Sequence, residues 1–350
     1  MTKTITVGLI THKEGAHVHA YLNALRDSVN CDRVVLVDPD HAWDEPAQRI
    51  LTTKLQGRYD SLDCMFQKES PTMALVTMEA VHAPPIIDQL LEGGCHVFAE
   101  KPACVALHQF TPLVEKADRK RLHLMFAFAN RIAPEVKAAR TLITEGHLGR
   151  IYGLDMHLIA DQTRLTRIAY QKQWFADRTR SGGGHLIWLG IHWLDLCMHL
   201  TGSRITHVTG AIANVGGQTI GVEDSAVATL EFDNGTLGTL TSGYFLDKGY
   251  HSQIKIWGSQ GWLQLQPGQT PALSWNATKE PSGDSVQHFT GATQPRGYTP
   301  FVQQAVASCA GHGSVPISNE ESLAALQTVF AIYRSADTGR RMPRTPEMSN

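Results

Sequence analysis

The sequence predicts an α/β protein with two domains, a parallel sheet in residues 1–127 and an α+β domain with a large, mainly antiparallel sheet in residues 128–350. Up to about Phe128, apolar runs rich in β-branched residues alternate with helical patterns, as in βαβ units. Beyond that point short strands follow one another across tight turns, which is typical of an antiparallel sheet. The length of 350 residues also exceeds that of one ordinary domain.

In the first domain we expect five strands, each apolar enough to be buried in a parallel sheet. They cover residues 4–10, 33–38, 73–77, 96–99 and 122–127. A helical pattern runs from about Ala16 to Ser28. Another passes through Ile86–Leu91 and ends at Gly93–Gly94.

In the second domain the first strand is expected at residues 150–160. The Asp-Asn-Gly sequence at 233–235 predicts a hairpin turn between strands at 227–232 and 236–242. Residues 258–261, Gly-Ser-Gln-Gly, predict another turn of the same kind.

The C-terminal third of the chain contains less regular patterns. Residues 267–300 are rich in Pro, Gly, Ser and Thr, and we expect an irregular loop there. Ser318 with Glu321 three positions later predicts a capped helix that reaches about Ala336. The last dozen residues are expected to form a loose tail.

The composition describes an ordinary globular protein, with 42% hydrophobic and 18% charged residues. The net charge of −2 argues against a nucleic acid or an anionic membrane as partner, because either would require a basic excess. The six cysteines stand singly, which favours reduced thiols in a cytoplasmic protein. No apolar run approaches the ~20 residues of a membrane span, and the N-terminal residues do not resemble a signal peptide.

Asp38 ends the second predicted strand, about two dozen residues after the first βα turn, which is the layout of a dinucleotide-binding domain. A carboxylate at that position holds the ribose hydroxyls of adenosine and would repel a 2′-phosphate. The sequence therefore favours NAD over NADP, although acids also end strands for local reasons.

The first turn departs from the glycine pattern G-x-G-x-x-G of such domains, because Thr11, Lys13 and Ala16 stand where the glycines belong. A lysine at the second position crowds the place where the backbone would meet the pyrophosphate. Three interpretations stay open. The loop is reshaped around Gly15, with His12, Lys13 and the helix N-terminus attracting the phosphates; or the site has lost its affinity for dinucleotides; or this is a plain surface loop.

Three glycines at 182–184 precede a helical pattern that ends at Thr201–Gly202. One face of this helix carries a polar stripe at spacings of three and four. Its members are His185, Trp188, His192, Asp195 and His199. The remaining face is apolar core. Because histidine titrates near neutral pH, the stripe is suited to proton transfer.

Each histidine of the stripe has a simpler interpretation as a hydrogen-bonded core residue. The glycines favour a functional role for His192, since they let a ligand approach the backbone at a helix N-terminus. Metal binding by His192, Asp195 and His199 is a weaker hypothesis. No cysteine pair supports it, and we expect no metal site.

Several short motifs follow one another along the chain: Val76–His82, Glu100–Pro102, Asn130–Pro134, Trp174–Asp177, Ser181–Gly184, Glu223–Ser225, Asp233–Gly235, Gly258–Gly261 and Ser335–Gly339. In this order and spacing they resemble the Gfo/Idh/MocA family of sugar and polyol oxidoreductases. The resemblance covers nearly the whole chain. It implies an N-terminal Rossmann domain that binds the dinucleotide and a C-terminal domain for substrate binding and oligomerisation.

The resemblance also implies a mechanism. The lysine of the Glu-Lys-Pro motif, here Lys101, would hydrogen-bond the reacting hydroxyl and stabilise the developing alkoxide. The histidine of the glycine-rich helix, here His192, would take the hydroxyl proton as hydride leaves the carbon. The family's aspartate in this helix falls on Trp188. The substrate therefore loses an acceptor for a neighbouring hydroxyl and gains a broad apolar face.

The same comparison places the other candidate residues. The cofactor-binding set would be Thr11, His12, Lys13, Asp38, Thr77, His82 and Glu100. The substrate-contacting set would be Trp174, His185 and Trp188. Asp195 is expected to be structural, and Trp188 either stacks on a sugar ring or fills core.

The leading hypothesis is therefore an NAD(P)-dependent oxidoreductase, with NAD preferred, acting on a hydroxyl or ketone of a sugar, sugar derivative or polyol. One alternative is a hydrolase or lyase that oxidises its substrate transiently with a retained NAD. Another is a sugar-sensing regulator without turnover. By resemblance alone, we also expect a homo-oligomer, either a dimer or a tetramer.

Overall fold

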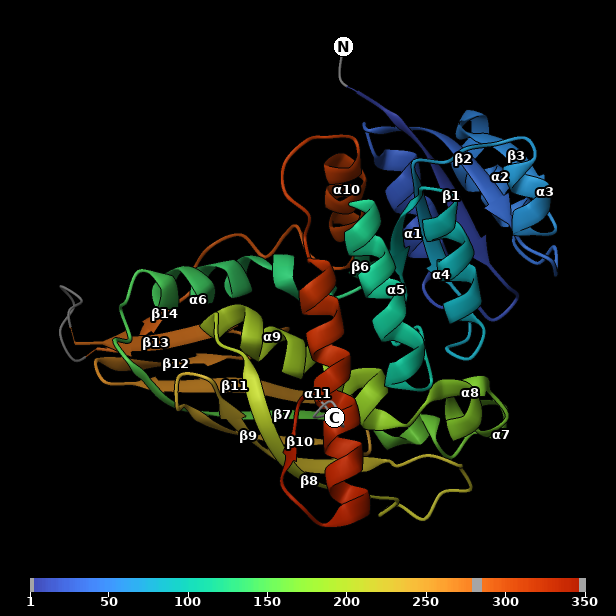
Figure 1. Ribbon diagram of the computed structural model, residues 1–350. Helices are drawn as coiled ribbons and strands as arrows, with labels where there is room; N and C mark the ends of the chain where they lie inside the picture. The colour runs from blue at the N-terminus through green and yellow to red at the C-terminus, as the bar shows by residue number, and fades with distance from the viewer. Residues whose placement is uncertain (1–2, 279–284, 346–350) are drawn as a thin grey trace. The chain divides into compact units, whose positions relative to one another are not determined.

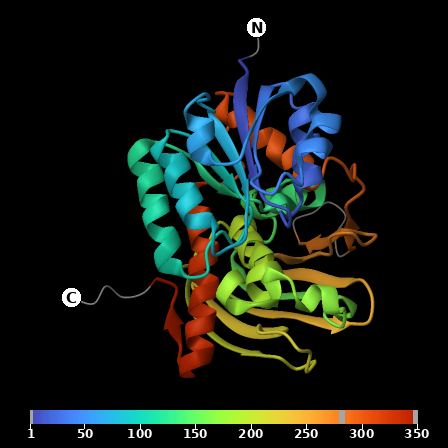
Figure 2. The same ribbon diagram turned by 90° about the vertical axis from the view of Figure 1, so that its right-hand side faces the viewer.

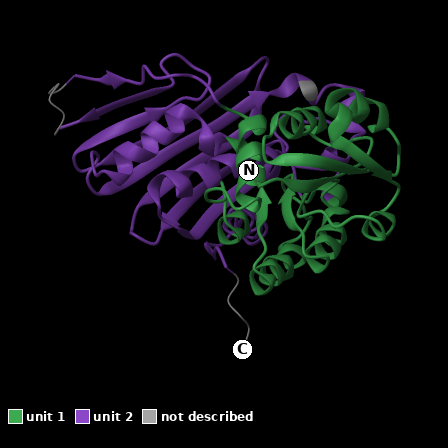
Figure 3. Cartoon of the chain, turned by 90° about the horizontal axis from the view of Figure 1, so that it is seen from above, with its two compact units in different colours: residues 1–129, 179–182, 296–323 green, residues 130–178, 183–295, 324–350 purple. Residues whose placement is uncertain are grey.

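The computed structural model describes residues 3–278 and 285–345, and the chain divides into two compact units (Figure 3). The first unit comprises residues up to 129 together with 179–182 and 296–323. The second comprises 130–178, 183–295 and the residues from 324 onward. Each unit has its own sheet and its own buried core.

The sheet of the first unit has six parallel strands in the order β3-β2-β1-β4-β5-β6 (Figure 1). The strands are β1 (Ile5–Thr11), β2 (Cys31–Val37), β3 (Leu55–Tyr59), β4 (Met73–Thr77), β5 (His96–Ala99) and β6 (Leu124–Phe126). This is the expected Rossmann arrangement, and the prediction is confirmed. The sequence analysis missed β3, because this edge strand carries Gln56, Gly57 and Arg58 and lacks a continuous apolar run.

Helices cover both faces of this parallel sheet (Figures 1 and 2). They are α1 (Val18–Asp27), α2 (Asp44–Leu51), α3 (Leu62–Phe66), α4 (Ala83–Glu92), α5 (Leu107–Lys120) and α10 (Tyr298–Cys309). Helix α1 packs against α2 and α10, whereas α4 packs against α5. Helix α10 therefore completes a layer built otherwise from residues near the N-terminus.

The sheet of the second unit has nine strands in the order β14-β13-β12-β11-β7-β10-β9-β8-β15. They are β7 (Ile151–Asp161), β8 (Ile205–Ala213), β9 (Ser225–Phe232), β10 (Leu237–Leu246), β11 (Tyr250–Gly258), β12 (Gly261–Leu265), β13 (Leu273–Ala277), β14 (Gln287–His288) and β15 (Met342–Pro343). Neighbouring strands are antiparallel except for the parallel pair β7 and β10. The predicted mainly antiparallel sheet is confirmed, as are both predicted hairpin turns.

Two expectations for the C-terminal third were wrong. The segment 267–300 is not simply an irregular loop, because β13, β14 and the first turn of α10 lie in it; its residues 279–284 lie outside the described part. The expected loose tail contains β15, which pairs with β8, and its residues 346–350 lie outside the described part. These strands are only two to five residues long, too short for a repeating apolar pattern to predict them.

The remaining helices are α6 (Pro134–Thr144), α7 (Ile168–Gln171), α8 (Arg178–Ser181), α9 (Ile191–Thr201) and α11 (Asn319–Thr338). The capping box predicted for α11 is present, with the backbone N–H of Glu321 donating to Ser318 Oγ and that of Ser318 donating to Glu321 Oε2. Helices α6 and α9 pack on the nine-stranded sheet, and α6 also contacts α9. No helix in the described ranges is long and apolar enough to cross a membrane.

Candidate active site

The carboxyl ends of β1, β2 and β4 meet at one edge of the parallel sheet, and a pocket of about 200 Å³ lies there. Parallel sheets bind their ligands at this edge. Its apolar lining consists of Ile10, Val37, Pro39, Leu62, Met78 and Ile86. A pocket with mainly apolar walls and a few polar groups at its rim suits a planar ring such as adenine.

Asp38 follows β2 directly, next to Pro39 of this pocket, and is buried. One carboxylate oxygen accepts the backbone N–H of Trp43 at 2.7 Å, and the other accepts that of Asp40 at 3.1 Å. The two hydrogen bonds fix the orientation of the carboxylate. Each oxygen keeps a lone pair that a ribose hydroxyl can use.

The turn after β1 is built around Gly15. The backbone N–H of Gly15 donates to the carbonyl oxygen of His12 at 2.9 Å and closes the turn. A Cβ at position 15 would overlap Thr11 Oγ1 and approach Val18 Cγ2 to 2.9 Å. Thr11 occupies the first glycine position, and the close approach of the turn is at Gly15.

This turn is also fixed to the segment that follows β2. The backbone N–H of Lys13 donates to Asp40 at 2.9 Å, and the indole N–H of Trp43 donates to the His12 carbonyl at 3.0 Å. The side chain of Lys13 is exposed, so its ammonium is available to an anion at the mouth of the turn. The turn is therefore more ordered than a plain surface loop.

His12 is buried, with 8% of its surface exposed, and its Nε2 has no hydrogen-bond partner among the described residues. Burial lowers the pKa of His12, although the negative charge of Glu79 opposes the shift. The imidazole is therefore neutral near neutral pH. It can offer a phosphate a hydrogen bond, whereas positive charge comes from Lys13.

Two other candidate cofactor residues are Thr77, the last residue of β4, and His82, which follows that strand. Thr77 is buried, and its hydroxyl donates to the carbonyl oxygen of Ala16 at 2.8 Å, which holds the turn against β4. His82 is exposed immediately before α4. Between them, Glu79 forms a two-point ion pair with Arg180.

Glu100 is fully enclosed after β5, and three groups hold its carboxylate. Oε1 accepts hydrogen bonds from the hydroxyl of Tyr21 and from Nδ1 of His17, the latter at 2.7 Å, and Oε2 accepts the backbone N–H of Lys101 at 3.1 Å. Burial alone would raise the pKa of Glu100. The hydrogen bond and charge of His17, with help from Lys101 and Tyr21, outweigh burial and lower this pKa, so the carboxylate is ionised.

Lys101 is buried at the same sheet edge, with 3% of its surface exposed. Burial lowers the pKa of its amine from 10.5 to about 8, and the charge of Glu100 limits the shift. An amine with this pKa exchanges its proton readily at neutral pH. Perturbed groups of this kind gather at functional sites.

In the second unit the glycines before the helix accommodate the protein's own side chains. A Cβ at Gly184 would overlap the carbonyl oxygen of Glu223, and one at Gly183 would overlap the hydroxyl of Tyr333. The Glu223 carboxylate accepts the backbone N–H groups of Gly184 and Leu186 at 2.8 and 3.1 Å and the Tyr333 hydroxyl at 2.8 Å. Burial raises the pKa of Glu223, although these hydrogen bonds oppose the shift. The group that caps this helix N-terminus is therefore the buried carboxyl group of Glu223.

The helix opens with a π-helical turn over Leu186–Gly190 and continues as α9. π-Helical turns often occur at functional sites. His192 and Trp188 are half-buried. His185 is completely buried, with Nδ1 at 2.7 Å from Ser242 Oγ and its ring edge on to Tyr244.

The rest of the polar stripe has structural partners. Asp195 forms a buried ion pair with Arg131, with distances of 2.6 and 2.9 Å, in accordance with the expected structural role. Arg140 donates to the ring of His199 at 2.7 Å. Within the described residues, no group of three or more His, Cys, Asp and Glu side chains is placed to hold a metal ion.

Trp188 lies among aromatic side chains. Its ring centroid is 5.3 Å from that of Trp174, which is buried, and 5.5 Å from that of Phe175. The structure therefore brings Trp174 and Trp188 into contact. Lys101 belongs to the first unit and His192 to the second.

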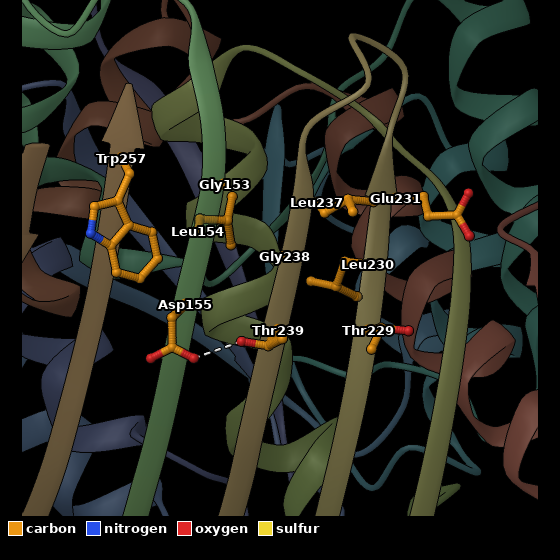
Figure 4. Close-up of a pocket in the computed structure, with 10 residues that line it drawn as sticks. All are labelled: Gly153, Leu154, Asp155, Thr229, Leu230, Glu231, Leu237, Gly238, Thr239 and Trp257. Carbon is orange, nitrogen blue, oxygen red and sulfur yellow. Dashed lines mark hydrogen bonds between the residues drawn. The ribbon is translucent and has the colours of Figure 1, made fainter. Parts of the chain in front are cut away.

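A wide groove of about 620 Å³ crosses the outer face of the nine-stranded sheet (Figure 4). Side chains of β7, β9, β10 and β11 line it, among them Asp155, Leu237 and Trp257. The hydroxyl of Thr239 on β10 donates to Asp155 on the neighbouring strand β7. The two carboxylates of the groove are engaged by other side chains, since Asp155 accepts from Thr239 and Glu231 pairs with Arg341. The groove is open and therefore resembles a contact surface more than a catalytic pocket.

The parallel sheet, the pocket at its carboxyl edge and the buried lysine define a dinucleotide-binding oxidoreductase. Residues 6–128 match the model of the oxidoreductase family with an NAD-binding Rossmann fold, and residues 136–264 match that of the GFO/IDH/MocA C-terminal domain. The protein therefore belongs to the Gfo/Idh/MocA family. The predicted family, NAD-binding fold and oxidoreductase class are confirmed.

Sequence relatives share about a quarter of their residues with this chain. The D-glucoside 3-dehydrogenase of Escherichia coli K12 is 26% identical over 322 residues, covering 86% of this chain and 82% of the relative. The myo-inositol dehydrogenase Hyg17 of Streptomyces leeuwenhoekii is 27% identical, covering 76% and 79% respectively. With the uncharacterized oxidoreductase YrbE of Bacillus subtilis, the similarity spans 58% of this chain and 57% of the relative.

Solved structures share the fold over the full length. The oxidoreductase domain protein of Kribbella flavida has a TM-score of 0.87 at 20% identity and covers 99% of this chain and 100% of its own. The WlbA dehydrogenase of Bordetella pertussis, solved with NADH and UDP-GlcNAcA, has a TM-score of 0.82 at 20% identity and covers 98% of both chains.

Sequence reasoning missed the residues that support the candidate site. His17, immediately before α1, and Tyr21 on α1 hold Glu100, and Tyr298 of α10 stacks on His17 at 4.2 Å. Glu223 was named only as part of the Glu223–Ser225 motif, and its sequence gave no sign that it caps the glycine-rich helix. These partners are far apart in sequence, so no local spacing could indicate them.

Proposed function

We propose that this protein is an NAD-dependent dehydrogenase that interconverts a hydroxyl and a ketone on a sugar, sugar derivative or polyol. Lys101 is the observation that carries the proposal. It is a buried amine with a pKa of about 8, placed directly after a strand at the ligand-binding edge of an NAD-binding sheet.

The residues at this edge fit a dinucleotide. Asp38 offers a fixed carboxylate to the adenosine ribose, and an anion there disfavours the 2′-phosphate of NADP. The N-terminus of α1, the His12 imidazole and the exposed Lys13 suit the pyrophosphate. Thr11 and Thr77 hold the turn, and His82 and Glu100 complete the set of cofactor residues.

Bound NAD would supply the hydride acceptor. In the oxidation direction, the protonated Lys101 amine donates a hydrogen bond to the reacting hydroxyl oxygen and stabilises negative charge as it develops there. His192, a half-buried imidazole, takes the hydroxyl proton as a general base. Glu100 keeps a negative charge beside Lys101 and so helps to retain the proton on the amine.

The relatives support a carbohydrate substrate, since two of them act on a glucoside and on an inositol. They favour a dehydrogenase over a hydrolase, a lyase or a regulator without turnover. Trp174 and Trp188 would contact the substrate, whereas His185 is enclosed and would act behind them.

The domain roles follow from the same proposal. Residues 1–127 would bind the dinucleotide, and residues 128–350 would bind substrate and form a homo-oligomer, a dimer or tetramer, through the exposed sheet face. A cytoplasmic location agrees with six free cysteines.

Calorimetric titration with NAD and NADP tests the cofactor assignment. Wild-type protein should bind NAD more tightly than NADP. Asp38→Ala should weaken NAD by about tenfold or more and reduce the preference, because one or two charge-assisted hydrogen bonds are lost. Lys13→Ala should weaken both nucleotides to a similar degree, and exposed Lys68→Ala serves as the control. If neither NAD nor NADP binds, the dehydrogenase assignment is refuted.

Absorbance of NADH during incubation with sugars and polyols tests the reaction. Lys101→Ala and His192→Asn should each reduce kcat by a factor of at least about 100 while NAD still binds, since each removes a group that acts in the transition state. Product formed without net NADH would instead favour a hydrolase or lyase with a retained NAD.

A further inference from the structure

Four aromatic side chains of the second unit form one cluster, which we call the aromatic wall. It consists of Tyr170, Trp174, Phe175 and Trp188. The centroid of Phe175 lies 4.5 Å from that of Tyr170 and 5.8 Å from that of Trp174, in addition to its contact with Trp188. The wall therefore joins the segment around α7 to the helix that carries His192.

Tyr244 of β10 holds the aromatic wall in place through Tyr170. The hydroxyl of Tyr170 lies 3.2 Å from that of Tyr244, and the backbone N–H of Tyr244 donates to the carbonyl oxygen of Asp224 at 3.0 Å. Trp174 is buried, whereas Tyr170, Phe175 and Trp188 are each only partly covered. The rings are thus ordered and retain surface that a ligand can contact.

Trp188 precedes His192 by four residues, about one helical turn, and both side chains are half-buried. A substrate held by His192 at its reacting carbon therefore has its adjoining portion within reach of Trp188. Phenylalanine rings accept no conventional hydrogen bond, and an indole offers only an N–H donor. A sugar hydroxyl placed against these rings would lose the hydrogen bond that it donates to water and gain none in return. A planar apolar group would gain contact area instead.

We propose that the aromatic wall is the subsite for an apolar, preferably aromatic, aglycone of a glycoside, with Trp188 as the specificity-determining residue. This inference rests on the proposed function, because His192 fixes the position of the reacting sugar. The substrate class is then a glycoside whose sugar ring is oxidised while the aglycone lies against Trp188.

Paired methyl and phenyl glycosides of glucose and galactose provide the test. For wild-type protein, KM for the phenyl member should be at least about fivefold lower, equivalent to about 1 kcal/mol, with a similar kcat. Trp188→Leu should remove most of this difference, and Trp188→Phe should restore much of it. Trp257→Leu, a tryptophan on the outer sheet face, should leave the ratio of the two KM values unchanged.

Quenching of intrinsic fluorescence by the same glycosides, without cofactor, separates this inference from the proposed function. Phenyl-selective binding that Trp188→Leu abolishes would support the wall even if no glycoside yields NADH. Equal KM values for methyl and phenyl glycosides, with normal turnover, would overturn the wall and leave the dehydrogenase assignment intact. Phenyl selectivity that persists in Trp188→Leu would also overturn it.

Discussion

Lys101 illustrates how one buried charge serves function at the expense of stability. Its folded pKa is about 8 against 10.5 in water, so below pH 8 the folded protein carries a charge that burial disfavours. The protein therefore loses stability at neutral pH by holding this amine, on the order of 3 kcal/mol.

We predict that Lys101→Met raises the free energy of unfolding at pH 7 by about 1–3 kcal/mol while abolishing turnover. Because the folded pKa is depressed, the gain should be largest below pH 8. It should shrink as the pH rises from 8 toward 10.5, where the unfolded amine also becomes neutral. Urea unfolding at several pH values measures this trend.

Exposed Lys68→Met is the matched control and should change stability little at any pH. A loss of stability in Lys101→Met that is constant with pH would show that the amine makes compensating interactions in the folded state. The pKa of Lys101 in the folded protein, obtained from the pH dependence of the free energy of unfolding, would then have to lie near its ordinary value.

At the residue scale, the sequence indicated the reacting groups better than their surroundings. Lys101 follows a recognisable strand, and a fold rule places it at the ligand-binding edge. The partners of Glu100 could not be predicted, because His17, immediately before α1, and Tyr21 on α1 lie about 80 positions earlier and Tyr298 about 200 positions later. Packing of the whole domain decides such contacts.

Among the elements, α9 depends on one buried ion pair. Asp195 and Arg131 have side chains that are 2% and 4% exposed, and the guanidinium donates to both carboxylate oxygens. Removing one member of a buried pair leaves the other charge in a poor environment.

We predict that Asp195→Ala lowers the free energy of unfolding by about 3–5 kcal/mol. The double substitution Asp195→Leu with Arg131→Met should recover most of the loss, since neither charge then remains buried. Asp247→Ala, at an exposed position, is the control in urea unfolding. A loss of kcat in Asp195→Ala at full stability would instead indicate a catalytic role for the carboxylate.

Predictions for whole elements succeeded where the chain carries a strong local signal. The Asp-Asn-Gly turn and the Ser318–Glu321 capping box are both present. The polar edge strand β3 and helix α10 were missed. The glycines at 183 and 184 were predicted correctly to permit a close approach, but the groups that approach are Glu223 and Tyr333 of the same chain. Glycines in a sequence indicate that some group approaches the backbone closely, but they do not show whether that group is a ligand or a distant part of the same chain.

For the whole molecule, the outer face of the nine-stranded sheet is a surface that the proposed chemistry does not use. Leu237 and Trp257 line the groove in Figure 4 and are 63% and 40% exposed. Val227, on β9 of the same sheet, is 52% exposed. Contiguous apolar side chains on a sheet face are typical of an interface between subunits. A stable interface requires roughly 800 Å² from each partner, which a face of four long strands can supply.

We therefore predict that the protein forms a homodimer or tetramer through this face and that Leu237→Asp dissociates it. A carboxylate introduced into the interface is buried without a counter-charge in each copy, so desolvation opposes assembly. Sedimentation at micromolar concentration should show a fall to the 38.5 kDa monomer, with binding of NAD retained.

Leu237→Ala should only weaken association, because it removes contact area without adding charge. Tyr152→Asp, at a position 61% exposed at the start of β7 and outside the groove lining, tests whether the effect is confined to the groove. If Leu237→Asp sediments like the wild type, the subunits contact one another elsewhere and the exposed groove serves another partner.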